Sequence, residues 1–358
     1  MKEVEFLKLG LDEDELGDDI LDMKKEFGRI MAQTRKRSKG DKCLHCNEEK
    51  SSFCNSHSVP AFCLRNISTN GSVYYSNTLI SMPLLDEDKG VRNAGTFQII
   101  CKECDNTIFQ EYENPDNYEK EVTPKMLAQI AMKNYLRHIG NRLNEHTMYE
   151  IIAEKNPLAS DFVRRMHDIQ DKDLDGYKRD YEKAKRLSKK DWKGEYYQFY
   201  HEKLDYVVPI AFQGSIAIVT DLDGQIINDI YCKDDSYRIQ NLHICIFPLK
   251  DTSVVMMFID SNDKRYRNFY RKFNKLSHYD KLALVNYIIF LYSEDVFLSK
   301  EIPEEILKDE KLVEISQQSS LVFSMNPVSS EIDEAKKIYD LSKRSKIPNL
   351  LSEKYKLR

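Results

Sequence analysis

Four cysteines, arranged as two Cys-x-x-Cys pairs, have the spacing in this chain that most clearly predicts chemistry. Cys43 and Cys46 form the first pair, and Cys101 and Cys104 form the second. A Cys-x-x-Cys turn presents two thiolates from one tight loop, and two such turns complete the tetrahedral shell that Zn²⁺ prefers. A closed shell of four thiolates leaves no open position for a substrate, so the sequence predicts a structural zinc ion. The alternative is that the four cysteines are ordinary buried thiols whose paired spacing in the sequence arises by chance.

Composition and charge favour a globular, cytoplasmic protein. The chain has 358 residues, of which 41% are hydrophobic and 32% are charged, and its net charge is −5. No apolar run approaches the roughly 20 residues of a membrane span, and the acidic N-terminus lacks the features of a signal peptide. We therefore expect a cytoplasmic protein with no membrane partner, and a reducing cytosol favours metal-bound cysteines over disulfides. The mild net charge means that nucleic-acid binding would depend on local basic patches.

A His-x-x-Pro sequence at His57 and Pro60 lies between the two cysteine pairs. The second pair continues as Cys101-Lys-Glu-Cys104-Asp105-Asn106-Thr107-Ile108-Phe109-Gln110-Glu111-Tyr112-Glu113. Over roughly residues 43–113 this order of motifs resembles the HNH endonuclease family, and is most similar to the branch whose second pair reads C-x-x-C-N-N-x-F-G-x-x-x-E. The resemblance implies a treble-clef, ββα-metal fold that hydrolyses phosphodiester bonds in DNA or RNA.

The resemblance also implies roles for three residues. His57 would be the general base that takes a proton from the attacking water, a task that suits an imidazole near neutral pH. Asp105 or Asn106 would hold a catalytic Mg²⁺ or Mn²⁺ ion, or orient His57. The zinc ion would clamp the hairpin to the helix so that these groups meet.

Two departures from the family pattern support a different function. Ser56 stands where the family often has an acidic metal ligand, and Phe109 and Gln110 stand where a closing ligand is expected on the helix. The alternative is therefore a non-catalytic zinc finger that binds nucleic acid or a protein partner. Nothing in the sequence sets the oligomeric state.

Other residues near the cysteine pairs have weaker signals. Cys54, three residues before His57, is a candidate nucleophile with His57 as its base. No third group that would orient this Cys54–His57 pair is indicated. His45, inside the first pair, is expected on an exposed loop. The basic run 35–42 lies directly before Cys43, so its cations are either a solvated linker or phosphate contacts.

The predicted fold class is α+β. We divide the chain into an N-terminal helical segment with a basic arm, an HNH-like zinc domain, a helical region, an α/β sheet domain and a C-terminal helical tail. These segments are residues 1–42, 43–115, 116–203, 204–300 and 301–358.

Periodicity and cap signals place the elements. Thr123-Pro124 predicts a helix start, and the charged, aromatic-rich stretch 161–201 is predicted to be helical. Short apolar or β-branched runs after Leu204 predict an antiparallel sheet with two following helices; the runs begin at Tyr206, Ser215, Gln225, Leu242 and Ser253, and the helices are 264–276 and 279–292. In the basic-aromatic run 264–273, aromatic residues recur at helical spacing, which predicts a buried stripe more than a base-stacking surface.

Overall fold

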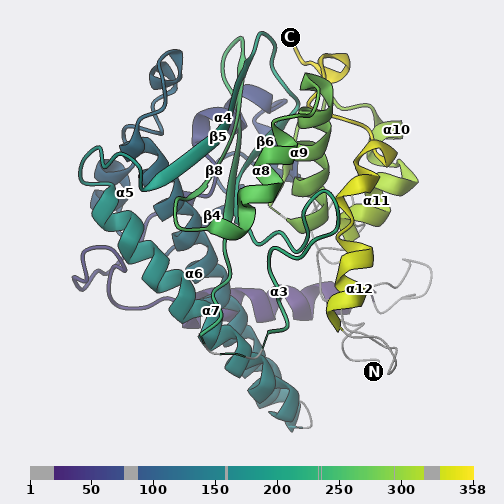
Figure 1. Ribbon diagram of the computed structural model, residues 1–358. Coiled ribbons are helices and arrows are strands. Elements are labelled where there is room, and N and C mark those ends of the chain that lie inside the picture. Colours follow the sequence, from purple (N-terminus) through teal and green to yellow (C-terminus); the bar gives the residue numbers. More distant parts are fainter. Residues whose placement is uncertain are drawn as a thin grey trace.

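The computed structural model shows a mixed α+β fold in which one antiparallel sheet is covered by helices (Figure 1). It describes residues 20–75, 88–157, 160–232, 234, 236–293, 295–317 and 331–358. The first 19 residues of the predicted N-terminal helical segment lie outside these ranges, as does the predicted start of a helix at Ser329 and Ser330. The predicted α+β class is confirmed.

The main sheet contains seven strands in the order β3-β2-β9-β6-β7-β8-β5, and every neighbouring pair is antiparallel. The strands are β2 (Ser72–Tyr75), β3 (Asp88–Gly90), β5 (Tyr196–Leu204), β6 (Ile210–Ile216), β7 (Leu242–Pro248), β8 (Ser253–Asp260) and β9 (Phe297–Leu298). Strands β2 and β3 come from the cysteine-rich segment, and β2 pairs with β9. The cysteine-rich segment therefore shares its sheet with the C-terminal half of the chain.

The central strands β7 and β8 are buried on both faces, because the sheet separates two hydrophobic cores. Alternate side chains of a strand point to opposite faces. Cys245, Phe247 and Met256 belong to the core that contains the cysteine pairs. Ile244 and Met257 belong to the other core, which is closed by the helices after the sheet. One face of the sheet thus supports the cysteine-rich segment directly.

Helix α6 (Pro124–Lys155) begins where the sequence predicts, since the Thr123 hydroxyl accepts a hydrogen bond from the Met126 amide at 3.1 Å. It forms a long antiparallel pair with α7 (Ser160–Leu187), and the end of the pair where the two helices connect extends beyond the sheet (Figure 1). The remaining described helices are α3 (Ile20–Arg37), α4 (Ala61–Ile67), α5 (Lys102–Ile108), α8 (Arg267–Phe273), α9 (His278–Tyr292), α10 (Glu304–Leu307), α11 (Glu310–Gln317) and α12 (Glu331–Ile338). No helix among the described residues is long and apolar enough to cross a membrane.

The two helices predicted after the sheet are present as α8 and α9. Tyr266, Phe269 and Phe273 of the basic-aromatic run are fully buried, which confirms the predicted buried stripe. Helix α9 is apolar around its whole circumference, as expected for a helix enclosed by the core.

Three predictions about this half of the chain were wrong. The runs beginning at Tyr206 and Ser215 are not two strands, because the single strand β6 crosses from one run into the other and pairs with β7. Residues 196–204 form strand β5 and not a helix, because their tyrosine- and phenylalanine-rich sequence pairs along β8 and tertiary pairing overrides local pattern. The run beginning at Gln225 is a loop in which Thr220 and Ile226 make only an isolated bridge. There the Asn228 amide donates to the carbonyls of Ile218 and Gln240, so a side chain satisfies backbone groups that a strand would have paired.

Candidate metal centre and its surroundings

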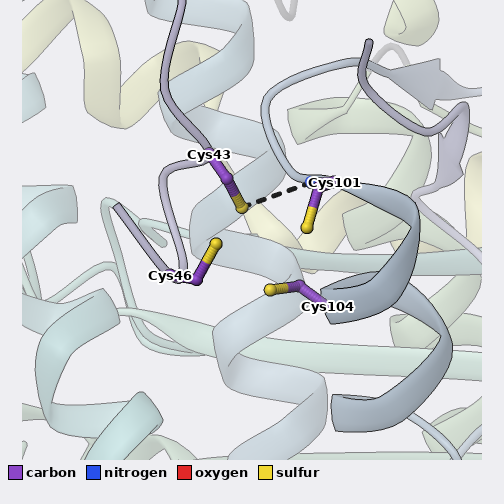
Figure 2. A group of neighbouring side chains, drawn as sticks. All are labelled: Cys43, Cys46, Cys101 and Cys104. Atoms are coloured by element: carbon purple, nitrogen blue, oxygen red, sulfur yellow. Dashed lines mark hydrogen bonds between the residues drawn. The ribbon is translucent and has the colours of Figure 1, made fainter. Parts of the chain in front are cut away.

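The four predicted ligands Cys43, Cys46, Cys101 and Cys104 come together in one cluster. Their sulfur atoms all lie within 4.8 Å of one another, close enough to hold one metal ion. Figure 2 shows the sulfurs facing a common centre, with one pair on a loop and the other at the start of a helix. This donor set and its compactness suit Zn²⁺, which takes four thiolates in a tetrahedral shell.

Tight turns present each pair of thiols. In the first turn the Asn47 amide donates to the Cys43 carbonyl at 2.8 Å, and Asn47 adopts a left-handed φ of 59°. Asparagine tolerates this conformation better than most residues. In the second turn Cys101 is the N-cap of α5, and its amide donates to the Cys43 sulfur at 3.2 Å (Figure 2). This hydrogen bond joins the two turns without the help of a metal ion.

Electrostatics within the cluster favour a bound cation. Burial disfavours the Cys43 thiolate, but backbone amides from Cys46, Cys101 and His45 outweigh it and lower the Cys43 pKa to about 7. Burial, reinforced by the neighbouring sulfurs, raises the pKa of Cys104. The Cys104 thiolate is thus disfavoured beside the other sulfurs, and a divalent cation in the cluster would supply the compensating charge.

Helix α7 fixes the first turn from outside. The His45 Nδ1 atom lies 2.8 Å from the Tyr181 hydroxyl, and Lys185 Nζ donates to the His45 carbonyl at 2.6 Å. His45 is half-buried and not exposed as expected, and burial, helped by the charges of Lys185 and Lys189, lowers its pKa to about 4. The imidazole is thus a neutral hydrogen-bonding group between the metal turn and α7.

His57 lies on a short hairpin beside the cluster. Strand β1 (Ser56–His57) pairs with β4 (Thr96–Phe97), and the second cysteine turn follows β4 closely. The half-buried His57 ring places Nε2 2.9 Å from the carbonyl oxygen of Val91. Because neighbouring residues of a strand point to opposite faces, Ser56 and His57 face different surroundings.

Asp105 belongs to a buried network on the Ser56 side of the hairpin. Its carboxylate accepts hydrogen bonds from Ser56 Oγ at 2.6 Å and from Lys133 Nζ at 2.9 Å. Cys54 Sγ lies 3.3 Å from the same carboxylate, and Glu113 lies 3.1 Å from Lys133 Nζ. Burial opposes ionisation of Asp105, but Lys133 and these hydrogen bonds outweigh it and hold the pKa of the carboxyl below its usual value.

The predicted catalytic residues are therefore distributed over two places. The hydrogen bonds of Asp105 go to Ser56, Lys133 and Cys54, while His57 bonds to Val91. Asn106 is exposed on α5, and its carbonyl accepts from the Gln110 amide at 2.8 Å. Cys54 contacts Asp105 and not His57, and burial raises its pKa to about 11, which makes it a poor nucleophile.

Sequence reasoning missed Lys133 and Val91. Lys133 is 1% exposed and its amine also lies 3.7 Å from the centre of the Phe109 ring. The sequence carries no clear signal for Lys133, because Gln129 and Arg137 stand four residues before and after it and make that helix face look polar. The Val91 carbonyl gave no signal, since any residue type supplies a backbone oxygen.

Gly95, in the loop between the Val91 carbonyl and β4, is expected to tolerate no side chain. Its φ is +62°, and an added Cβ would lie 2.4 Å from Phe297 Cζ and 2.6 Å from Ser58 Oγ. We expect Gly95→Ala to lower the free energy of unfolding by about 2–4 kcal/mol, the sum of left-handed strain and overpacking. Urea denaturation of the zinc-loaded protein measures this change.

Gly71→Ala is the matched control, because Gly71 has a φ of +74° but open space around its Cβ position. It is expected to cost only the strain, about 1–2 kcal/mol. Equal losses for the two variants would show that the contact with Phe297 and Ser58 does not constrain this loop.

No protein-family model, curated protein or solved structure matches the chain.

Proposed function

We propose that residues 43–113 form an HNH-like treble-clef module clamped by a structural zinc ion, and that the protein is a metal-dependent endonuclease acting on DNA or RNA. The order of elements supports this proposal: a cysteine turn, the β1–β4 hairpin, a second cysteine turn and α5 follow one another. A closed thiolate shell would make the zinc ion a clamp, so the chemistry belongs to His57 on the hairpin.

The orientation of His57 is the observation that carries the proposal. A carbonyl oxygen can only accept a hydrogen bond, so the contact with Val91 requires His57 Nε2 to carry the proton. In the neutral ring Nδ1 is then a lone-pair acceptor, and within the described part of the chain it makes no hydrogen bond. A base whose free nitrogen is fixed in direction by a third group is the arrangement that general-base catalysis needs.

In the proposed reaction His57 Nδ1 takes a proton from a water molecule. The water oxygen forms a bond to phosphorus, the bond from phosphorus to the leaving sugar oxygen breaks, and that oxygen takes a proton from solvent. The Val91 carbonyl stabilises the resulting imidazolium, because the proton on Nε2 becomes more acidic when the ring is charged. Val91 is thus a positioning residue that acts through its backbone.

Asp105 does not fit as a ligand for the proposed Mg²⁺ or Mn²⁺ ion in this arrangement. Lys133 already balances its charge at 2.9 Å, and a divalent cation there would lie beside a buried ammonium group. Asn106, exposed at the next position, offers one amide oxygen. A divalent cation would therefore depend on phosphate oxygens and water, and should bind weakly in the absence of nucleic acid.

A non-catalytic zinc finger that binds nucleic acid or a protein is the second candidate. The specific observation in its favour is the network of Ser56, Asp105 and Lys133, which lies where the family pattern expects metal ligands. In this second function His57 would only anchor the loop that contains Val91.

Cleavage assays separate the two functions. With Mg²⁺ or Mn²⁺, we expect the zinc-loaded protein to nick supercoiled plasmid or cleave structured RNA, and His57→Ala to lower the rate by roughly 10²- to 10⁴-fold. His278→Ala, which removes an exposed imidazole outside this site, should leave the rate unchanged. Zinc content and circular dichroism confirm that each variant is folded. Equal cleavage by the wild type and His57→Ala, or none by the wild type on any substrate, would contradict the proposal.

A further inference from the structure

A basic segment containing the only tryptophan of the chain lies at the end of α7 and in the turn that follows. Its exposed members are Arg186, Lys189, Lys190, Trp192 and Lys193, here named the basic tryptophan segment. Trp192 is 42% exposed, so its indole is accessible to a ligand. Lys190 Nζ lies 4.0 Å from the centre of its ring.

Local hydrogen bonds fix the backbone of this segment while leaving its cations available. The Asp191 carboxylate accepts from the Lys125 amide at 3.1 Å, and the Trp192 amide donates to the Lys190 carbonyl at 2.9 Å. The Asp191 carboxylate is thus bonded to a backbone amide. Within the described ranges, the side chains of Arg186, Lys189 and Lys193 make no hydrogen bond or ion pair.

The segment is joined to the metal-binding module. Lys185, one residue before it begins, donates to the carbonyl of His45 inside the first cysteine turn at 2.6 Å. Tyr181, one helical turn earlier on α7, lies 2.8 Å from His45 Nδ1. The start of the basic tryptophan segment therefore lies beside the first cysteine turn.

We propose that the basic tryptophan segment binds nucleic acid that presents unpaired bases. Trp192 would stack on a base, and Lys189, Lys190 and Lys193 would contact the flanking phosphates. Cations alone would suit any polyanion, but an exposed indole among them matches a chain whose bases offer π faces between charged groups. The choice of nucleic acid rests on the proposed function, whereas the binding itself does not require cleavage.

Because Trp192 is the only tryptophan, its fluorescence reports on this segment alone. The zinc-loaded His57→Ala protein is titrated, in EDTA-free buffer without added divalent metal, with an oligothymidylate of about 20 nucleotides. We expect the indole emission to be quenched on binding. The same-length duplex should bind without this quenching, and poly-glutamate of equal charge should neither quench nor compete.

Charge variants test the phosphate contacts through the anisotropy of a labelled oligothymidylate. In Lys189→Gln/Lys190→Gln/Lys193→Gln the slope of log K against log salt should become less negative by about 2, since each single-strand contact contributes about 0.7. Trp192→Leu should weaken binding by roughly 5- to 150-fold. The matched control is Arg267→Gln/Arg271→Gln/Lys275→Gln, which removes three exposed charges from α8 and its C-terminal end and should change neither quantity.

Absence of quenching at saturating oligonucleotide would overturn the proposal, as would equal affinity for the wild-type segment and the charge variant. Equal quenching by the duplex would overturn the requirement for unpaired bases, and quenching by poly-glutamate would indicate an acidic protein partner instead. A failure of cleavage in the presence of normal quenching would reject the nuclease function alone.

Discussion

Replacement of Cys101 with serine is expected to abolish zinc binding and to unfold the metal-binding segment. A structural four-thiolate zinc contributes on the order of 10 kcal/mol to folding of the segment that holds it. Cys101 is buried, and it is both the N-cap of α5 and a hydrogen-bond donor to Cys43. The loss should spread, because β2 of the same segment pairs with β9 of the main sheet.

Metal analysis and thermal unfolding measure this effect. Cys232→Ser is the matched control, since Cys232 is exposed and lies outside the cluster. It should retain one zinc ion per chain and the wild-type Tm, whereas Cys101→Ser should lose both. A Cys101→Ser protein that keeps its zinc and its Tm would contradict the four-cysteine clamp.

Replacement of Lys133 with methionine is expected to cost about 3–5 kcal/mol of unfolding free energy, because it leaves buried carboxylate charge without its partner. The lysine side chain is 1% exposed and the Asp105 side chain 14% exposed, so water replaces little of the lost interaction. Ser56 also loses the Lys133 amine at 2.8 Å. Methionine keeps most of the length and apolar volume of the lysine side chain, so the loss of unfolding free energy measures the contribution of the charge.

A double-mutant cycle checks this interpretation. Adding Asp105→Asn to Lys133→Met removes the orphaned charge and should restore part of the stability. Glu113→Gln should cost less than about 1 kcal/mol, because that carboxylate is 33% exposed and its pairing with Lys133 is screened by solvent. If the double variant is less stable than Lys133→Met alone, the pair does not stabilise the fold in this way.

Much of the fold could be predicted from local signals. The cap and periodicity at Thr123 placed the start of α6, and β-branched runs placed β7 and β8 close to their observed bounds. Strand β5 could not be found this way, because its structure depends on pairing with β8 some fifty residues later in the chain. Pairing between distant segments has no signature in a single local window.

The metal cluster could be predicted because ligand type and spacing are written in the sequence, and the structure brings those four thiols together. The surroundings of His57 could not. Its partner is a backbone oxygen 34 residues away, and Asp105, predicted to orient His57 or hold a metal ion, is held by a lysine on another helix. The type of a residue shows that it can make hydrogen bonds, but the packing of the folded chain decides which group it bonds to.

X-ray absorption at the zinc edge distinguishes a zinc ion that is closed by four thiolates, with His57 free for chemistry, from a zinc ion that His57 ligates. We expect four sulfur ligands at about 2.3 Å and no imidazole ligand. A shell containing nitrogen at about 2.0 Å, lost in His57→Ala, would place His57 on the zinc ion and contradict its proposed role as a base.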